Sequence, residues 1–334
     1  MKKIFLLSII LVLAYNANAT KWRLNNNPGI NANFSDWNSA YATANDNDTI
    51  FVEGSTISYG DITISKPLTI IGPGYFLSEN PQTQKLLVTA KFGYFTINNG
   101  SSGSLITGLE ITNGINIACG NISVIKNKLY AVYLSSNISC SNILICQNYI
   151  KWEIVNNTGA SIYNVIISNN IINGSNIYQL RTIELGNNIS GTITNNVISG
   201  PNGSYSIGDA INVNNFLITN NIINRGNILG SNNAFSNNIS NGSQLPVGNN
   251  NQLNVDMSNV YVILGSTDGS CKLKPGSPAI GAGINGVDCG AFGGAQPYVL
   301  SGIPAGPSVY EINTSSTTGS TNGGLDVNVK AKIH

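Results

Sequence analysis

Four charged side chains in the middle of the chain are the residues best suited to chemistry. Lys151 and Glu153 stand in one alternation of apolar and polar residues, and Arg181 and Glu184 stand in a later one. Aligning the two segments makes Glu153 and Glu184 neighbours. Two carboxylates about 5 Å apart serve a retaining glycosidase as nucleophile and general acid, and a Lys or Arg can remove the proton in a polysaccharide lyase. These four residues are the candidate catalytic groups.

The same outward face could bind a ligand without reacting with it. If Trp152 and Ile183 point into the protein, alternation turns the polar residues beside them outward. A solvated face is the alternative, because Lys151 and Arg181 can neutralise the two carboxylates. The candidate ligand-binding residues are Tyr133, Glu153, Arg181 and Asp209. A platform for sugar rings would come from tyrosines on successive strands, namely Tyr130, Tyr133, Tyr149, Tyr163, Tyr178 and Tyr205.

A repeated phrase that ends in Asn positions these segments. It recurs at intervals of 17 to 26 residues, which is typical of one turn of a solenoid. Asn favours turns and tolerates left-handed backbone, and stacked Asn side chains can hydrogen-bond along a ladder. The pattern predicts an all-β, right-handed parallel β-helix rather than a leucine-rich repeat, which demands a regular Leu pattern. The final residues of the phrase are Asn127, Asn148, Asn170, Asn196, Asn221 and Asn238.

The two ends of the chain depart from the repeat. Lys2 and Lys3, an apolar run and Ala17-Asn-Ala19 predict a signal peptide over residues 1–19, and the run is shorter than the roughly 20 residues of a membrane span. Residues 20–48 are expected to form an N-terminal cap, with an amphipathic helix between Phe34 and Ala44. We assign residues 49–294 to the β-helix and 295–334 to a connector and a β-hairpin-like tail.

The content of charged residues and of cysteines limits which partners and which disulfides are possible. Charged residues make up only 9% of the chain, so no basic field is available for nucleic acid. Cys119 and Cys140 occupy equivalent places on adjacent coils, where a disulfide and two stacked thiols are both compatible with the spacing. A Cys271–Cys289 disulfide would close the last compact loop.

Residues 48–54 and 68–72, with the Asn-Asn coils, resemble the pectate-lyase-like right-handed β-helix superfamily. The Gly-Ser-Pro-Ala-Ile-Gly-Ala-Gly stretch near the end resembles exported bacterial β-helix proteins. The resemblance implies the scaffold, and it makes a polysaccharide lyase and a glycoside hydrolase candidate functions. However, the Asn-Thr-Asp, Asp-Asp, Gly-His-Gly and Arg-Ile-Lys motifs of polygalacturonase-type enzymes do not occur, and the one histidine is the last residue, His334. The acidic residues are scattered singly, so no metal site is predicted.

The sequence therefore favours an exported, noncatalytic β-helix, secreted or at the cell surface, that is structural, adhesive or carbohydrate-binding. The alternative is a polysaccharide lyase or glycoside hydrolase that acts on an extracellular glycan. We expect an extracellular polysaccharide or a cell-surface partner, no nucleic acid and no transmembrane segment. No cofactor is expected, and Ca²⁺ enters only with the lyase alternative. The oligomeric state stays open.

Overall fold

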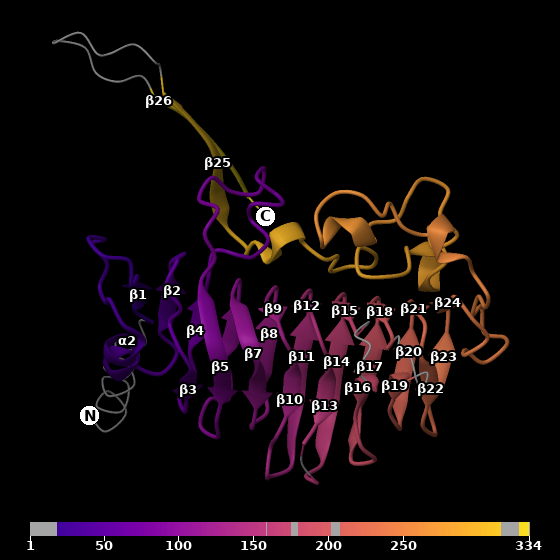
Figure 1. Ribbon diagram of the computed structural model, residues 1–334. Coiled ribbons are helices and arrows are strands. Elements are labelled where there is room, and N and C mark those ends of the chain that lie inside the picture. Colours follow the sequence, from indigo (N-terminus) through magenta and orange to yellow (C-terminus); the bar gives the residue numbers. More distant parts are fainter. Residues whose placement is uncertain (1–18, 158, 175–179, 202–207, 315–326, 334) are drawn as a thin grey trace, which may run out of the picture.

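The computed structural model describes residues 19–157, 159–174, 180–201, 208–314 and 327–333. Most of its strands belong to two long parallel sheets that wrap around one apolar interior (Figure 1). The expected parallel β-helix is therefore confirmed. Within the described residues, we find no helix that is both long enough and apolar enough to span a membrane. The segment expected to be a signal peptide lies outside the described residues except for its last position.

One face of the solenoid is a sheet of ten parallel strands, called sheet A here. Neighbouring strands come from successive coils, so each strand pairs with the one a full turn away. In spatial order the strands are β1 (Lys21–Leu24), β2 (Thr49–Val52), β4 (Thr69–Ile71), β6 (Leu105–Thr107), β8 (Ile122–Ile125), β11 (Cys140–Cys146), β14 (Ile162–Ser168), β17 (Ile189–Thr194), β20 (Phe216–Thr219) and β23 (Ala234–Ser236).

The other two faces belong to a sheet of 14 strands, called sheet B here. It starts with β3 (Ile62–Ile64), β5 (Lys91–Ile97) and β7 (Glu110–Ile117), and beyond β7 it divides into two lanes. The first lane contains β10 (Val132–Leu134), β13 (Ile154–Asn156), β16 (Arg181–Glu184), β19 (Asp209–Asn212) and β22 (Asn227–Leu229). The second lane contains β9 (Lys128–Leu129), β12 (Tyr149–Ile150), β15 (Ile171–Asn173), β18 (Val197–Ser199), β21 (Ile222–Asn224) and β24 (Ile239–Ser240).

The turn between sheet A and the second lane explains the repeated phrase. Its first residue adopts a left-handed backbone, with φ of 53° at Asn169, 54° at Asn195 and 58° at Asn220. Asn is among the residues that tolerate this conformation. The second Asn of each pair turns its side chain inward, and it is fully buried at Asn170 and Asn196. The two residues of each Asn-Asn pair therefore have different roles. The first bends the chain, and the second forms hydrogen bonds to the next coil.

The inward amides form the expected ladder along the helix. The Oδ1 atom of Asn170 accepts from the backbone N of Asn148 at 2.9 Å and from its Nδ2 at 3.0 Å. Asn170 donates in the same way to Asn196, at 2.9 and 3.0 Å, and its Nδ2 also donates to the carbonyl of Ile145 at 2.9 Å. The pattern repeats from Asn127 to Asn251. Buried amides therefore satisfy one another within the ladder.

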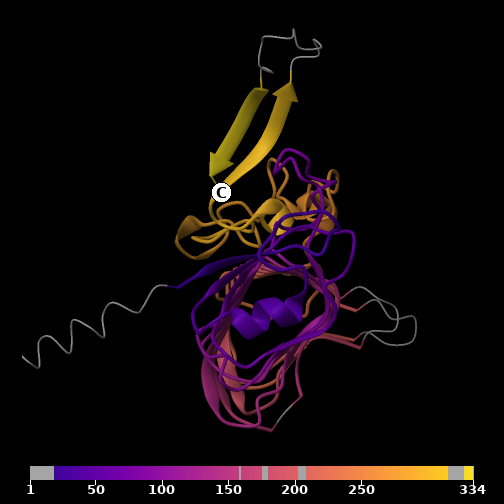
Figure 2. The same cartoon turned by 90° about the vertical axis from the view of Figure 1, so that its left-hand side faces the viewer.

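A short helix closes the N-terminal end of the solenoid, as the sequence predicts. Helix α2 (Trp37–Thr43) lies across the opening of the first coils, seen end-on in Figure 2. Asp36 caps it, because its Oδ1 accepts from the backbone N of Ser39 at 2.9 Å. Trp37 is buried and meets the ring of Phe92 edge-on at 5.8 Å. The helix thus covers apolar side chains that an open coil would expose to water.

The C-terminal part departs from the expected boundaries. The long sheets end at Ser240, so the coils stop well before Gly294. Residues 255–303, called the return segment here, run back along the outside of the solenoid (Figure 1). They contain four short 3₁₀ helices, η1 (Met257–Asn259), η2 (Gly269–Cys271), η3 (Ile284–Gly286) and η4 (Leu300–Gly302). The Gly- and Pro-rich composition of this region favours such loops over strands.

The outward residues of the Asn-Asn turns hold the return segment. The side-chain amide of Asn237 donates to the carbonyl of Ala282 at 2.9 Å. Asn169, on an earlier coil, donates to the carbonyls of Ala291 at 3.0 Å and Gly293 at 2.7 Å. Later residues of the return segment thus contact earlier coils. The first Asn of successive Asn-Asn pairs supplies the hydrogen bonds that hold this segment against the solenoid.

A two-stranded antiparallel hairpin ends the described chain, as expected for the tail. It consists of β25 (Pro307–Thr314) and β26 (Val327–Ile333) and projects away from the solenoid (Figures 1 and 2). At its base, the backbone N of Lys85 donates to the carbonyl of Val309 at 2.7 Å, and the Ser308 hydroxyl donates to the carbonyl of Thr83 at 3.1 Å. The hairpin is thus attached to the loop that follows β4.

All five cysteines lie in the described part of the chain and are free thiols. Cys119 and Cys140 do stack on adjacent coils, in line with the pairing of Ile122 with Ile143, but they are not bonded to each other. Cys271 packs beside one apolar cluster of the return segment and Cys289 lies in another. Neither candidate disulfide is present, and the first pair forms the stacked thiols that were the alternative.

Burial raises the pKa of Cys271 to about 11 and that of Cys289 to about 12, from an ordinary value of 9.0. The unfolded chain ionises these thiols first as the pH rises, so their contribution to stability is complete below pH 9 and is lost between pH 9 and about 12. We expect unfolding midpoints in urea to fall over this range. A thiol titration without reductant should find five reactive groups in denaturant and slow reaction in the native protein. Fewer than five would reveal a disulfide.

Candidate functional site

The candidate residues lie on the outer side of sheet B, in its first lane. Val132, Ile154 and Ile183 pair in register and are fully buried in the core. Alternation therefore places the next residues of each strand, including Val155 and Glu184, in one outward row. Val155 takes the position that the sequence alignment gave to Glu153. The expected direct pairing of Glu153 with Glu184 was wrong.

The cause is a longer corner in the coil that contains Glu153. Leu129 pairs with Ile150 before the corner and Val132 pairs with Ile154 after it, so the later coil has one more residue between the two lanes. Because of the extra residue, strand β13 begins one position later in the sequence than the alignment assumed, which changes which of its side chains face the core. Trp152, expected to point inward, instead lies in the corner.

Arg181 nevertheless brings the two carboxylates together. Its Nε atom lies 3.1 Å from Oε2 of Glu153, and its Nη1 atom lies 3.4 Å from Oε1 of Glu184. The side chain of Glu153 is only 11% exposed, whereas those of Glu184 and Arg181 are 40% and 41% exposed. The guanidinium group bridges the two acids, and a partly buried pair of this kind is costly to break because it leaves an uncompensated charge.

The remaining charged candidates lie on either side of this bridge. Asp209 pairs in register with Arg181 on the adjacent coil, and its Oδ1 accepts from Nδ2 of Asn227 at 3.3 Å. Lys151 is exposed and forms no ion pair among the described residues. The structure therefore gathers Glu153, Arg181 and Asp209, while Lys151 stays at the solvent-facing corner.

Aromatic rings lie beside the charged bridge. The rings of Tyr130 and Trp152 stack with their centroids 5.6 Å apart and their planes at 15°. Tyr133 pairs in register with Val155, which in turn pairs with Glu184, so this tyrosine stands in the same outward row as Glu184. Burial, and then the nearby carboxylate of Glu153, raise the pKa of Tyr133. Tyr94, which is 48% exposed, stands on the same side of sheet B two coils earlier than Tyr133.

A glycine makes room for the ring of Tyr133. A Cβ atom on Gly114 would come within 2.7 Å of Cε2 of Tyr133, and the φ of Gly114 is +119°. No other residue type combines this backbone conformation with that space. Gly114, Tyr94 and the contact of Trp152 with Tyr130 could not be predicted from the sequence, because only the strand pairing shows which residues of distant coils share this surface.

The expected platform of six tyrosines does not form as one surface. Tyr149 is buried, and its ring meets that of Phe76 edge-on at 5.0 Å. Tyr163 is 54% exposed but belongs to sheet A. Tyr178 and Tyr205 lie outside the described residues. The rings at the candidate site are those of Tyr94, Tyr130, Tyr133 and Trp152, and we call these rings together with Glu153, Arg181, Glu184 and Asp209 the aromatic–acidic surface.

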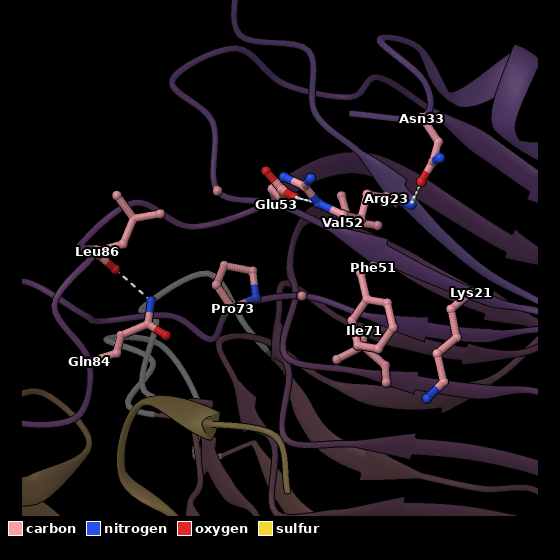
Figure 3. Close-up of a pocket in the computed structure, with 12 residues that line it drawn as sticks. Lys21, Arg23, Asn33, Phe51, Val52, Glu53, Ile71, Pro73, Gln84 and Leu86 are labelled. Atoms are coloured by element: carbon pink, nitrogen blue, oxygen red, sulfur yellow. Dashed lines mark hydrogen bonds and ion pairs between the residues drawn. The ribbon is translucent and has the colours of Figure 1, made fainter. Parts of the chain in front are cut away.

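A separate pocket of about 600 Å³ lies near the N-terminal end of sheet A (Figure 3). Phe51 and Ile71 project side by side from β2 and β4, and Leu86 lies beyond Pro73 on the loop after β4 (Figure 3). On the rim, Nε of Arg23 lies 2.6 Å from Oε1 of Glu53, a residue that also lines the pocket. This pocket could not be predicted from the sequence, because its walls come from separate segments of the chain.

Neither place has the ligands of a metal centre. Among the residues that the structure describes, no group of three or more His, Cys, Asp and Glu side chains could hold a metal ion. Comparisons with protein-family models, with curated proteins and with solved structures found no match. The architecture defines the class of protein, which is a parallel β-helix with an N-terminal cap and a docked return segment.

Proposed function

We propose that this protein is an exported, noncatalytic β-helix of the pectate-lyase-like superfamily that works at the cell surface as a carbohydrate-binding or adhesive module. The observation that carries the proposal is the aromatic–acidic surface, where the stacked rings of Tyr130 and Trp152 adjoin the bridge between Arg181 and two carboxylates. Aromatic faces pack against the apolar C–H surfaces of sugars. The signal-peptide pattern and the resemblance of the opening coils support export and family.

The same bridge argues against a glycosidase. A glycosidase places its two carboxylates on either side of a scissile bond. Here the guanidinium group of Arg181 contacts both Glu153 and Glu184, at 3.1 and 3.4 Å. The sugar would have to displace Arg181 and leave the partly buried Glu153 without its counter-charge. A lyase would need a base, and Lys151 and Arg181 are the groups that the surface offers.

We expect mature protein, residues 20–334, to be retained by at least one polysaccharide without releasing new reducing or unsaturated ends. Tyr133→Ala should weaken retention about tenfold, the equivalent of roughly 1.4 kcal/mol, because it removes a ring from the surface. Affinity electrophoresis on a panel of polysaccharides, with and without Ca²⁺, measures the retention, and assays of reducing and unsaturated ends measure cleavage.

Tyr163→Ala is the matched control, because Tyr163 is an exposed tyrosine on sheet A. It should leave retention unchanged. Cleavage that disappears in both Glu153→Ala and Glu184→Ala would contradict the noncatalytic proposal and establish the enzyme alternative. Equal losses in the two tyrosine variants would place the binding surface elsewhere.

A further inference from the structure

We infer that the aromatic–acidic surface selects glycans of uncharged sugars over polyuronates, an inference that rests on the proposed function. Glu153, Glu184 and Asp209 supply three carboxylates, all on coils next to or shared with Arg181. Acidic groups outnumber basic ones here even when the exposed Lys151 is counted. Juxtaposed like charges oppose binding, so a polyuronate meets repulsion that a neutral chain does not.

Arg181 is already engaged and does not offset this repulsion. Its guanidinium group contacts Glu153 at 3.1 Å and Glu184 at 3.4 Å, and Asp209 stands next to it in register on the following coil. A uronate carboxylate could pair with Arg181 only by displacing one of these acids. Displacing Glu153, whose side chain is 11% exposed, would leave a poorly solvated charge without a partner.

The other groups on this surface are uncharged and suit a neutral sugar. Asn212 pairs in register with Glu184, and Asn227 lies beyond Asp209 with its amide bonded to that carboxylate. The amide of Asn212 offers both donors and an acceptor to sugar hydroxyls, and the ring of Tyr133 offers an apolar face.

The test is calorimetric titration of residues 20–334 with a soluble β-glucan, a galactomannan and polygalacturonate at low and high salt. We expect at least one neutral polymer to bind about tenfold more tightly than polygalacturonate, with an affinity that salt does not change. Glu184→Lys should raise the affinity for polygalacturonate about tenfold, because it replaces a repelling charge by an attracting one.

Tighter binding of polygalacturonate than of both neutral polymers, lost in Tyr133→Ala, would overturn the inference and leave the proposed function standing. An affinity for polygalacturonate that Glu184→Lys leaves unchanged would also count against it. Absence of binding to every polymer would contradict the proposed function itself and the inference with it.

Discussion

Replacing Asn170 by alanine is expected to lower the free energy of unfolding by about 3 to 5 kcal/mol. The substitution removes the acceptor for the backbone N and Nδ2 of Asn148 and the donor to the carbonyl of Ile145. All of these groups are buried, and each polar group left without a partner costs roughly 1 to 3 kcal/mol. The shift of the urea unfolding midpoint, followed by circular dichroism, measures the loss.

Asn142→Gly is the control, because Asn142 takes part in a similar but exposed pair. Its Nδ2 donates to Oδ1 of Asn121 at 2.9 Å, and its φ of 63° suits glycine. Water can replace the lost bond, so we expect a change below about 1 kcal/mol. An equally small effect of Asn170→Ala would contradict a stabilising role of the buried ladder.

Replacing Asp268 by alanine is expected to release the return segment and to cost about 3 kcal/mol. Asp268 is fully buried, and its Oδ2 accepts from the backbone N of Ser301 at 2.7 Å and from the hydroxyl of Tyr298 at 3.4 Å. Its Oδ1 accepts from Nδ2 of Asn80 at 3.0 Å. The carboxylate thus joins the return segment to the loop after β4, and its removal leaves the buried backbone N of Ser301 and the half-buried amide of Asn80 without this acceptor.

Limited proteolysis and hydrogen exchange should then show faster cleavage and exchange over residues 255–303, with the β signal of the solenoid retained. Asp256→Ala is the matched control, because Asp256 is an exposed acid of the same segment that caps η1 through the backbone N of Ser258 at 2.9 Å. It should cost about 1 kcal/mol or less. Loss of the whole fold in Asp268→Ala would show that the coils depend on the return segment.

The scaffold could be predicted because its determinants are local and repeated. An Asn-Asn pair predicts a left-handed turn residue followed by an inward amide. Asn169 has the left-handed backbone, and Asn170 has the inward amide. The amphipathic spacing around Trp37 announces the cap helix, which the structure confirms. Each of these signals depends on neighbouring residues and on a recurring period, so no knowledge of distant contacts is needed.

The candidate site could be predicted only in part. Glu153, Arg181 and Asp209 were assigned to the same face, and the structure places them on adjacent coils. The prediction that Glu153 and Glu184 are direct neighbours was wrong, because one additional residue in the corner around Lys151 shifts the register of the following strand. Corner length varies from coil to coil, and the apolar alternation of a short strand does not reveal it.

The sequence by itself thus determined the class of fold, the Asn ladder and the N-terminal cap, since backbone preference and apolar periodicity act over a few residues. Only the tertiary structure decided how Arg181 joins two carboxylates, and that the return segment docks on the outward amides of residues such as Asn169. These arrangements depend on strand register and on contacts between residues far apart in the chain, which no local pattern encodes.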